Sequence, residues 1–124
     1  MKKRLLIVED TQVLAENIAD LFRMEGYEVD ISENGLQGLH QIQQNAYDVV
    51  ITDLIMPVMG GEAMVNEIRI NATHMPIVVL TARHLDEVQH EHLRAAGVDA
   101  ILNKTVEIDV LLDVVLKLAE RNDE

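Results

Sequence analysis

The chain has 124 residues, 48% hydrophobic and 26% charged, and this length predicts a single domain over residues 1–124. It contains no cysteine, so disulfides, thiolate metal sites and cysteine nucleophiles are excluded. Ten basic against 22 acidic residues give a net charge of −12, which argues against direct nucleic-acid binding and against attachment to an anionic membrane. No stretch approaches the ~20 apolar residues of a membrane helix. The basic N-terminus is followed by an apolar run too short for a signal peptide, so we expect a cytoplasmic protein.

Five short apolar runs along the chain predict five strands. None is joined to the next by a two-residue hairpin turn, and such runs are typical of strands buried on both faces of a parallel sheet. The runs cover residues 5–8, 29–31, 49–51, 77–80 and 100–102.

The segments between these runs have helical spacing of their apolar residues. We expect Asp10 or Thr11 to cap the first helix, and a charged tail to follow the last. The expected helices cover about 14–22 with an end at Gly26, 36–42 with an end near Asn45, 61–71, 85–96 with an end at Gly97, and 108–118 before the tail 120–124. Strand and helix alternate five times, which predicts a (βα)5 fold: a doubly wound, five-stranded parallel sheet in a three-layer α/β/α sandwich of the flavodoxin-like class.

Polar side chains follow four of the five expected strands. Ligands bind outside the carboxyl ends of the strands in an open parallel sheet, so we expect these residues to meet at one edge. The second strand, an expected edge strand, is followed by nothing chemically distinctive. The side chains in question are Glu9 and Asp10 after the first strand, Asp53 after the third, Thr81 after the fourth and Lys104 after the fifth.

This set of side chains suits phosphoryl chemistry. Three carboxylates held close together repel one another unless cations balance them, and Mg2+ prefers oxygen ligands. An ammonium group and a hydroxyl complete the parts needed to hold a phosphoryl group, and a carboxylate can itself accept one as an aspartyl phosphate. Glu9-Asp10 occupies the first strand-to-helix turn, where a nucleotide site would need a glycine-rich loop. Position 55 is isoleucine, which argues against a phosphatase with a paired Asp-x-Asp.

Four motifs make the chain, from Arg4 to about Leu118, resemble the receiver domain of two-component response regulators (CheY-like). They are Leu-Ile-Val-Glu-Asp at 6–10, Asp-Leu-Ile-Met-Pro-Val-Met-Gly-Gly at 53–61, Leu-Thr-Ala at 80–82, and Lys104. The resemblance implies that Asp53 accepts a phosphoryl group from a histidine of a sensor kinase or phosphotransfer protein. It also implies Mg2+ held by Glu9, Asp10, Asp53 and the backbone carbonyl of Ile55.

The resemblance further implies a switch rather than an enzyme that acts on outside substrates. Lys104 would pair with Asp53 and later with the phosphoryl oxygens. Thr81 would donate a hydrogen bond to a phosphoryl oxygen and so pull its loop inward. The chain would catalyse only its own phosphorylation and dephosphorylation. A downstream protein would read the change on the face of the fourth and fifth helices. The chain ends soon after the fifth helix, so we expect either a stand-alone receiver or one cut from a longer protein.

Two positions depart from the family pattern. Thr105 follows the lysine where proline, often after a cis bond, is usual; a cis bond before a non-proline residue costs ~3 kcal/mol, so we expect a trans bond and a locally rearranged loop. Ile101 replaces the usual Tyr or Phe, so the aromatic part of the switch is missing, and we expect a plain strand core residue. Both departures keep open a receiver-like scaffold with weak or no response to phosphorylation. A third possibility is a Mg2+-dependent phosphohydrolase that uses Asp53.

Other residues carry smaller expectations. Ile55 and Arg83 flank the expected path of the water that would hydrolyse the aspartyl phosphate, and an Ile55→Asn variant is hypothesised to hydrolyse faster. His90 and His92 lie two residues apart on the fourth helix and so point to different faces, which favours a solvated, pH-sensitive surface over a metal site. Pro57 and the pair Gly60-Gly61 are expected to shape the turn before the third helix.

Overall fold

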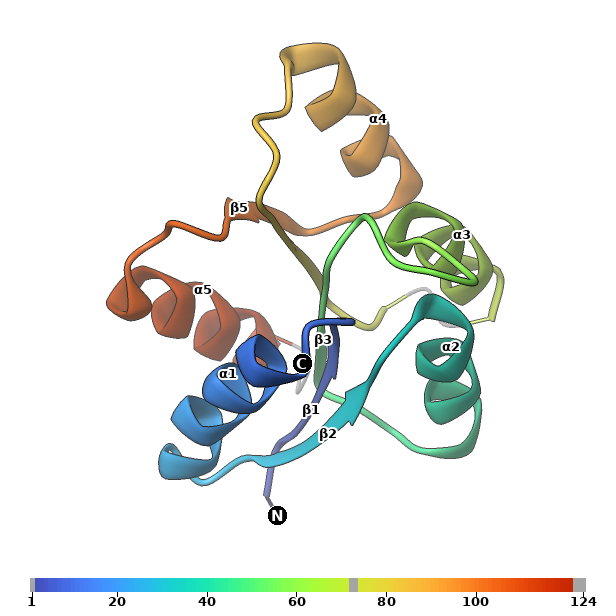
Figure 1. Ribbon diagram of the computed structural model, residues 1–124. Coiled ribbons are helices and arrows are strands. Elements are labelled where there is room, and N and C mark those ends of the chain that lie inside the picture. Colours follow the sequence, from blue (N-terminus) through green and yellow to red (C-terminus); the bar gives the residue numbers. More distant parts are fainter. Residues whose placement is uncertain (1, 72–73, 122–124) are drawn as a thin grey trace.

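The computed structural model describes residues 2–71 and 74–121. Strands and helices alternate throughout this part of the chain (Figure 1). Their bounds are β1 Arg4–Val8, α1 Gln12–Met24, β2 Glu28–Ser32, α2 Gly35–Gln44, β3 Val49–Thr52, α3 Gly61–Asn71, β4 Ile77–Thr81, α4 Glu87–Ala96, β5 Ala100–Asn103 and α5 Ile108–Arg121. None of the described helices is long and apolar enough to cross a membrane.

The five strands form one parallel sheet in the order β2-β1-β3-β4-β5. Successive side chains of a strand point to opposite faces, and each face has its own hydrophobic cluster. In β1, Leu5 and Ile7 pack with α1 and α5, whereas Leu6 and Val8 pack with α2, α3 and α4. The helices therefore cover both faces of the sheet (Figure 1). The predicted doubly wound α/β/α sandwich is confirmed, with β2 at one edge.

The helix ends agree with the sequence except at the starts of α1 and α4 and at the end of α5. Helix α4 begins at Glu87, two residues later than expected, because the Asp86 carboxylate accepts the Gln89 N–H (2.8 Å) and the Gln89 side chain accepts the Asp86 N–H (3.0 Å). This reciprocal capping fixes the first turn. Thr11 is the N-cap residue of α1, but its side chain makes no capping hydrogen bond.

Two glycines end helices as expected. Gly26 (φ 90°) follows α1 and Gly97 (φ 109°) caps α4, both in the left-handed region that favours glycine. Helix α5 continues through Glu120 and Arg121, so the predicted tail begins inside the helix; residues 122–124 lie outside the described part.

Candidate phosphoacceptor site

The candidate site lies at the carboxyl edge of the sheet, where the sequence places it. Glu9 and Asp10 follow β1, and Asp53 follows the neighbouring strand β3. Carboxylate oxygens of these three residues lie within 4.8 Å of one another. Glu9 is only 4% exposed, while Asp10 faces solvent. Three carboxylates this close repel one another, so the cluster favours a bound cation.

Lys104 supplies one positive charge to this cluster. Its ammonium group lies 2.6 Å from Glu9 Oε1 and 2.9 Å from Asp53 Oδ2. Burial lowers the pKa of Lys104, but its hydrogen bonds to and the charges of Glu9 and Asp53 outweigh burial and raise this pKa above its ordinary value. Lys104 is therefore charged at neutral pH. One ammonium against three carboxylates still leaves the site with an excess of negative charge.

Backbone groups hold the carboxylates in place. The Thr11 N–H donates to Glu9 Oε2 (3.0 Å), and the Leu54 N–H donates to Asp53 Oδ1 (2.7 Å). Glu9 and Asp53 thus each have one carboxylate oxygen bound by a backbone amide and the other bound by Lys104. The side chains are fixed before any ligand arrives, which is the geometry that charge stabilisation requires.

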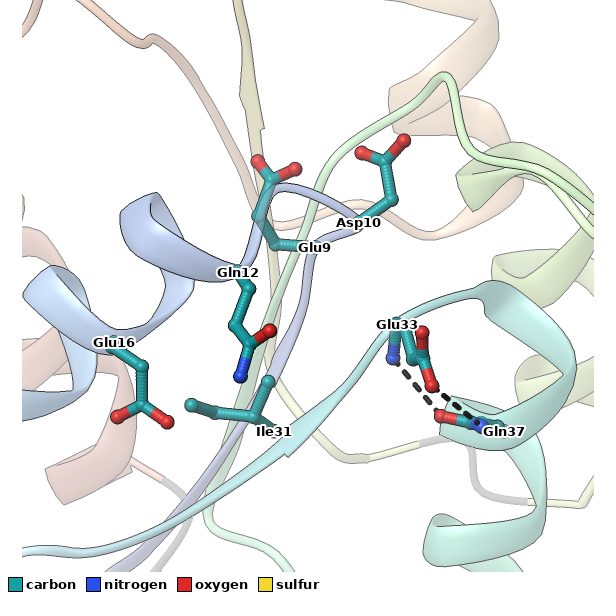
Figure 2. Close-up of a pocket in the computed structure, with 7 residues that line it drawn as sticks. All are labelled: Glu9, Asp10, Gln12, Glu16, Ile31, Glu33 and Gln37. Atoms are coloured by element: carbon teal, nitrogen blue, oxygen red, sulfur yellow. Dashed lines mark hydrogen bonds between the residues drawn. The ribbon is translucent and has the colours of Figure 1, made fainter.

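The solvent side of the cluster is also acidic. Glu9 and Asp10 border a hollow of about 330 Å3 between the end of β2 and the beginnings of α1 and α2. Figure 2 shows both carboxylates at the upper rim and the hydrogen-bonded pair Glu33 and Gln37 at the side. The other lining residues are Gln12, Glu16 and Ile31. The approach to the site is therefore negative and attracts cations.

Thr81 and Ile55 take separate places beside the carboxylates. Thr81 ends β4 and is buried, and its hydroxyl accepts the Arg83 N–H (3.2 Å). Among the hydrogen bonds of the described residues, none joins Thr81 to Asp53. Ile55 lies in the β3–α3 loop and is 57% exposed; its aliphatic side chain offers no metal ligand, so any metal contact would come from its carbonyl.

The loop after Asp53 contains features that the sequence analysis missed. Val58, not Gly60 or Gly61, has the left-handed backbone (φ 68°), in a three-residue turn closed by the Met59 N–H and the Pro57 carbonyl (2.7 Å). Gly61 is required for another reason: a Cβ atom there would collide with the carbonyl oxygen of Asp53. A glycine directly before a helix signals such a close approach only weakly.

Thr105 and Ile101, the two positions that depart from the family pattern, lie just after β5 and within it. The bond between Lys104 and Thr105 is trans, as expected, and no described peptide bond is cis. Ile101 is only partly buried: it packs against the cluster on the α2, α3 and α4 face, and together with Thr81 it borders a hollow of about 150 Å3. The prediction of a plain core residue is therefore only partly right. β5 is an edge strand, which leaves Ile101 with fewer neighbours than a central position would give.

Among the described residues, the histidines of α4 form no metal cluster. The one group of candidate metal ligands found there consists of Glu9, Asp10 and Asp53. The His92 imidazole instead contacts the Glu62 carboxylate at the start of α3 (2.5 Å). The acidic group fits a hard cation, because each of the three residues offers a carboxylate oxygen and these oxygens lie within 4.8 Å of one another.

Comparison with known proteins shows the family of the chain. The response regulator receiver domain family matches residues 5–116. A response regulator receiver protein of Anaeromyxobacter is 38% identical over 112 residues, 90% of this chain and 47% of that protein. The sensor histidine kinase RcsC of Salmonella typhimurium is 32% identical over 94% of this chain and 12% of its own length. The chain thus spans about half of the first relative and a small part of the second.

A solved structure shows the same fold. The response regulator protein TrrA of Thermotoga maritima, in complex with Mg2+ and BeF, is similar with a TM-score of 0.84 and 33% identity over 94% of this chain and 98% of that one. The sequence motifs, the sheet order and the family match agree, and this chain belongs to the response regulator receiver domain family.

Proposed function

We propose that the chain is a phosphorylation-controlled switch in which Asp53 accepts a phosphoryl group from a phosphohistidine. The donor would be a sensor histidine kinase or a phosphotransfer protein. The observation that supports this most strongly is the position of the Asp53 carboxylate, 2.9 Å from Lys104 and within 4.8 Å of the Glu9 and Asp10 carboxylates. This proposal is consistent with the family to which the chain belongs.

In the proposed reaction, a carboxylate oxygen of Asp53 attacks phosphorus in line with the bond to the donor's imidazole. The new O–P bond forms as the P–N bond breaks, and its electron pair remains on the imidazole nitrogen. The imidazole leaves neutral because its other nitrogen carries a proton. Phosphoryl transfer involves little covalent chemistry by the protein, so positioning and charge supply most of the acceleration.

The surrounding residues would neutralise the charge of the phosphoryl group. Lys104 already contacts Asp53 and can pair with a phosphoryl oxygen without a large movement of its backbone. Thr81 would exchange its bond from the Arg83 N–H for one to a phosphoryl oxygen, which would draw the β4–α4 loop toward Asp53. Glu9, Asp10, Asp53 and the Ile55 carbonyl would hold Mg2+, which when bound offsets the negative charge on the transferring oxygens.

The loop movement would be read on the face formed by α4 and α5, where a downstream protein would bind. Ile101 favours a second candidate, a receiver-like scaffold, because a branched aliphatic side chain cannot rotate into the hollow beside Thr81 as a ring would. The scaffold could accept phosphate at Asp53 and yet bind its partner equally before and after.

The experiment is to incubate the chain with Mg2+ and acetyl phosphate and to follow its mass and its amide NMR spectrum. A switch gains one acid-stable, base-labile phosphoryl group, and signals in the β4–α4 loop and α4 shift. A scaffold gains none, or gains one without these shifts, and a phosphohydrolase turns over acetyl phosphate continuously. The Asp53→Asn variant should give no phosphorylated form, because an amide is a poor nucleophile; a phosphorylated Asp53→Asn variant would overturn the assignment.

A further inference from the structure

The turn between β5 and α5 carries Lys104 and is closed by a side chain as well as by the backbone. The Val106 N–H donates to the Asn103 carbonyl (2.9 Å), so Lys104 and Thr105 are the two central residues of a β-turn. The side-chain oxygen Oδ1 of Asn103 accepts two further bonds, from the Thr105 N–H (2.9 Å) and from the Thr105 hydroxyl (2.8 Å). The backbone of Lys104 is thus held between two residues that bind each other.

The same turn is tied to the neighbouring strand. The Lys104 N–H donates to the Thr81 carbonyl (2.8 Å), and Asn103 stands opposite Thr81 in the parallel register of β4 and β5. The Asn103 amide nitrogen also reaches the Arg83 carbonyl, at 3.4 Å. That contact is long and therefore weak, whereas the two bonds to Thr105 have the length of strong hydrogen bonds.

A fixed backbone matters here because of the length of the lysine side chain. Its ammonium group must lie between Glu9 and Asp53, at 2.6 and 2.9 Å, and a flexible four-carbon stem magnifies any rotation at its base. Displacement of a positioned group by about 1 Å can cost up to two orders of magnitude in rate. The hydrogen bonds of Asn103 fix the point from which this stem starts.

We propose that Asn103 and Thr105 are positioning residues for Lys104, and that the acceptor oxygen of Asn103 is the group that holds the lysine in place. The inference rests on the proposed function for its kinetic consequence, but the position of Lys104 is a property of the protein before phosphorylation. A purely structural role would be the alternative: the turn would only hold β5 to the beginning of α5, and its loss would lower stability without moving Lys104.

Three variants separate these roles. Asn103→Ala removes the acceptor and the weak donor to Arg83. Asn103→Asp keeps an acceptor oxygen for Thr105, loses the donor and adds a negative charge, so it is measured at high salt, which screens that charge. Thr105→Val keeps the N–H and loses the hydroxyl. Asn45→Ala is a matched control, because the Asn45 side-chain amide also makes two local hydrogen bonds, both donated to Gln41, to its backbone carbonyl and to its side-chain oxygen.

The first measurement, made without any phosphodonor, is the 1H–15N NMR signal of the Lys104 ammonium group, whose hydrogen exchange is slowed by its two carboxylate partners. We expect this signal to broaden or vanish in Asn103→Ala, to persist in Asn103→Asp, and to be intact in Asn45→Ala. Urea unfolding of the same variants gives their stability. If Asn103→Ala is less stable than the wild type but keeps the signal, the role is structural and the proposal fails. It also fails if Asn103→Asp behaves as Asn103→Ala does.

The second measurement is the rate of phosphorylation by acetyl phosphate at saturating Mg2+. Asn103→Ala should be slower by about tenfold and Thr105→Val by about threefold, with Asn103→Asp close to the wild type. An unchanged rate in Asn103→Ala would overturn the proposal. A wild-type chain that takes up no phosphate would refute the proposed function instead, and the ammonium signal would still decide whether Asn103 positions Lys104.

Discussion

The two edges of the sheet balance the charge of their carboxylates in opposite ways. At the amino edge, Asp99 accepts bonds from Arg69 (3.1 Å), Arg121 (2.7 Å) and the Ile77 N–H (2.8 Å), so one carboxylate meets two guanidinium groups and an amide. At the carboxyl edge, three carboxylates share Lys104. The charge of Asp99 at the amino edge is thus balanced by arginines of the protein itself, whereas the carboxyl edge carries more negative than positive charge. The first arrangement stabilises the fold, whereas the second favours the binding of a cation.

The strongest test of this comparison is to remove the carboxylate of the amino edge. Asp99→Ala removes the ion pairs of Asp99 with Arg69 and Arg121 and leaves the Ile77 N–H without its carboxylate acceptor, so we expect the free energy of unfolding to fall by about 3 kcal/mol. Urea denaturation measures the change. Asp99→Asn keeps a hydrogen-bond acceptor and should lose less. An Asp99→Ala variant as stable as the wild type would show that the amino edge is not a stabilising cluster.

A second test adds Mg2+, the cation that the carboxyl edge is proposed to bind. Mg2+ at 100 times its Kd should raise the free energy of unfolding by about 2.7 kcal/mol, because it binds the folded chain and not the unfolded one. Thermal unfolding with and without Mg2+ gives this increment. Asp99→Asn should retain the increment, since Asp99 is not among the clustered carboxylates, and Asp10→Asn should lose most of it. An equal increment in both variants would place the cation elsewhere.

The two edges also differ in how far the sequence predicts them. Asp53 and Lys104 are 51 residues apart, yet their meeting follows from topology alone, because parallel strands bring all their carboxyl ends to one edge. The sequence assigns Gly61 only a part in the turn before α3 and assigns Asn103 no role. Their contacts depend on the path of a loop: which amide a side-chain oxygen meets, and which carbonyl a Cβ atom would touch. Asp99 at the amino edge was missed for the same reason.

A third test, with a smaller expected effect, concerns the contacts of Tyr47 with Asp30 and Arg4. The Tyr47 hydroxyl donates to Asp30 (2.6 Å) under the guanidinium group of Arg4, and Tyr47→Phe should lower the free energy of unfolding by about 1.5 kcal/mol. Burial, followed by the hydrogen bond to Asp30 and its charge, raises the pKa of Tyr47 above its ordinary value of 10.0.

The sign of the pH effect follows from that direction. A raised pKa means that the fold favours the protonated phenol, so its contribution is full below pH 10.0 and is lost as the pH rises toward the pKa of the folded state. The stability difference between wild type and Tyr47→Phe should therefore shrink above pH 10.0, as measured by urea denaturation in a Tyr27→Phe background. A difference that is constant across this range would show that the phenol is not linked to folding.

The smallest expected effect is a gain in stability, opposite in sign to the losses expected for Asp99→Ala and Tyr47→Phe. It therefore discriminates best between a structural role and a binding role for the carboxylate. Asp10→Asn removes one of three mutually repelling carboxylates without taking a partner from Lys104, whose contacts are with Glu9 and Asp53. Without Mg2+ we expect the variant to be slightly more stable than the wild type, since relief of repulsion is the main change and Asp10 faces solvent. High salt should reduce the gain, because it screens exposed charges. A carboxylate whose removal stabilises the fold serves binding and not structure. If Asp10→Asn is instead less stable than the wild type at low salt, the protein's own groups balance the carboxylates of the carboxyl edge, and the argument for a cation there fails.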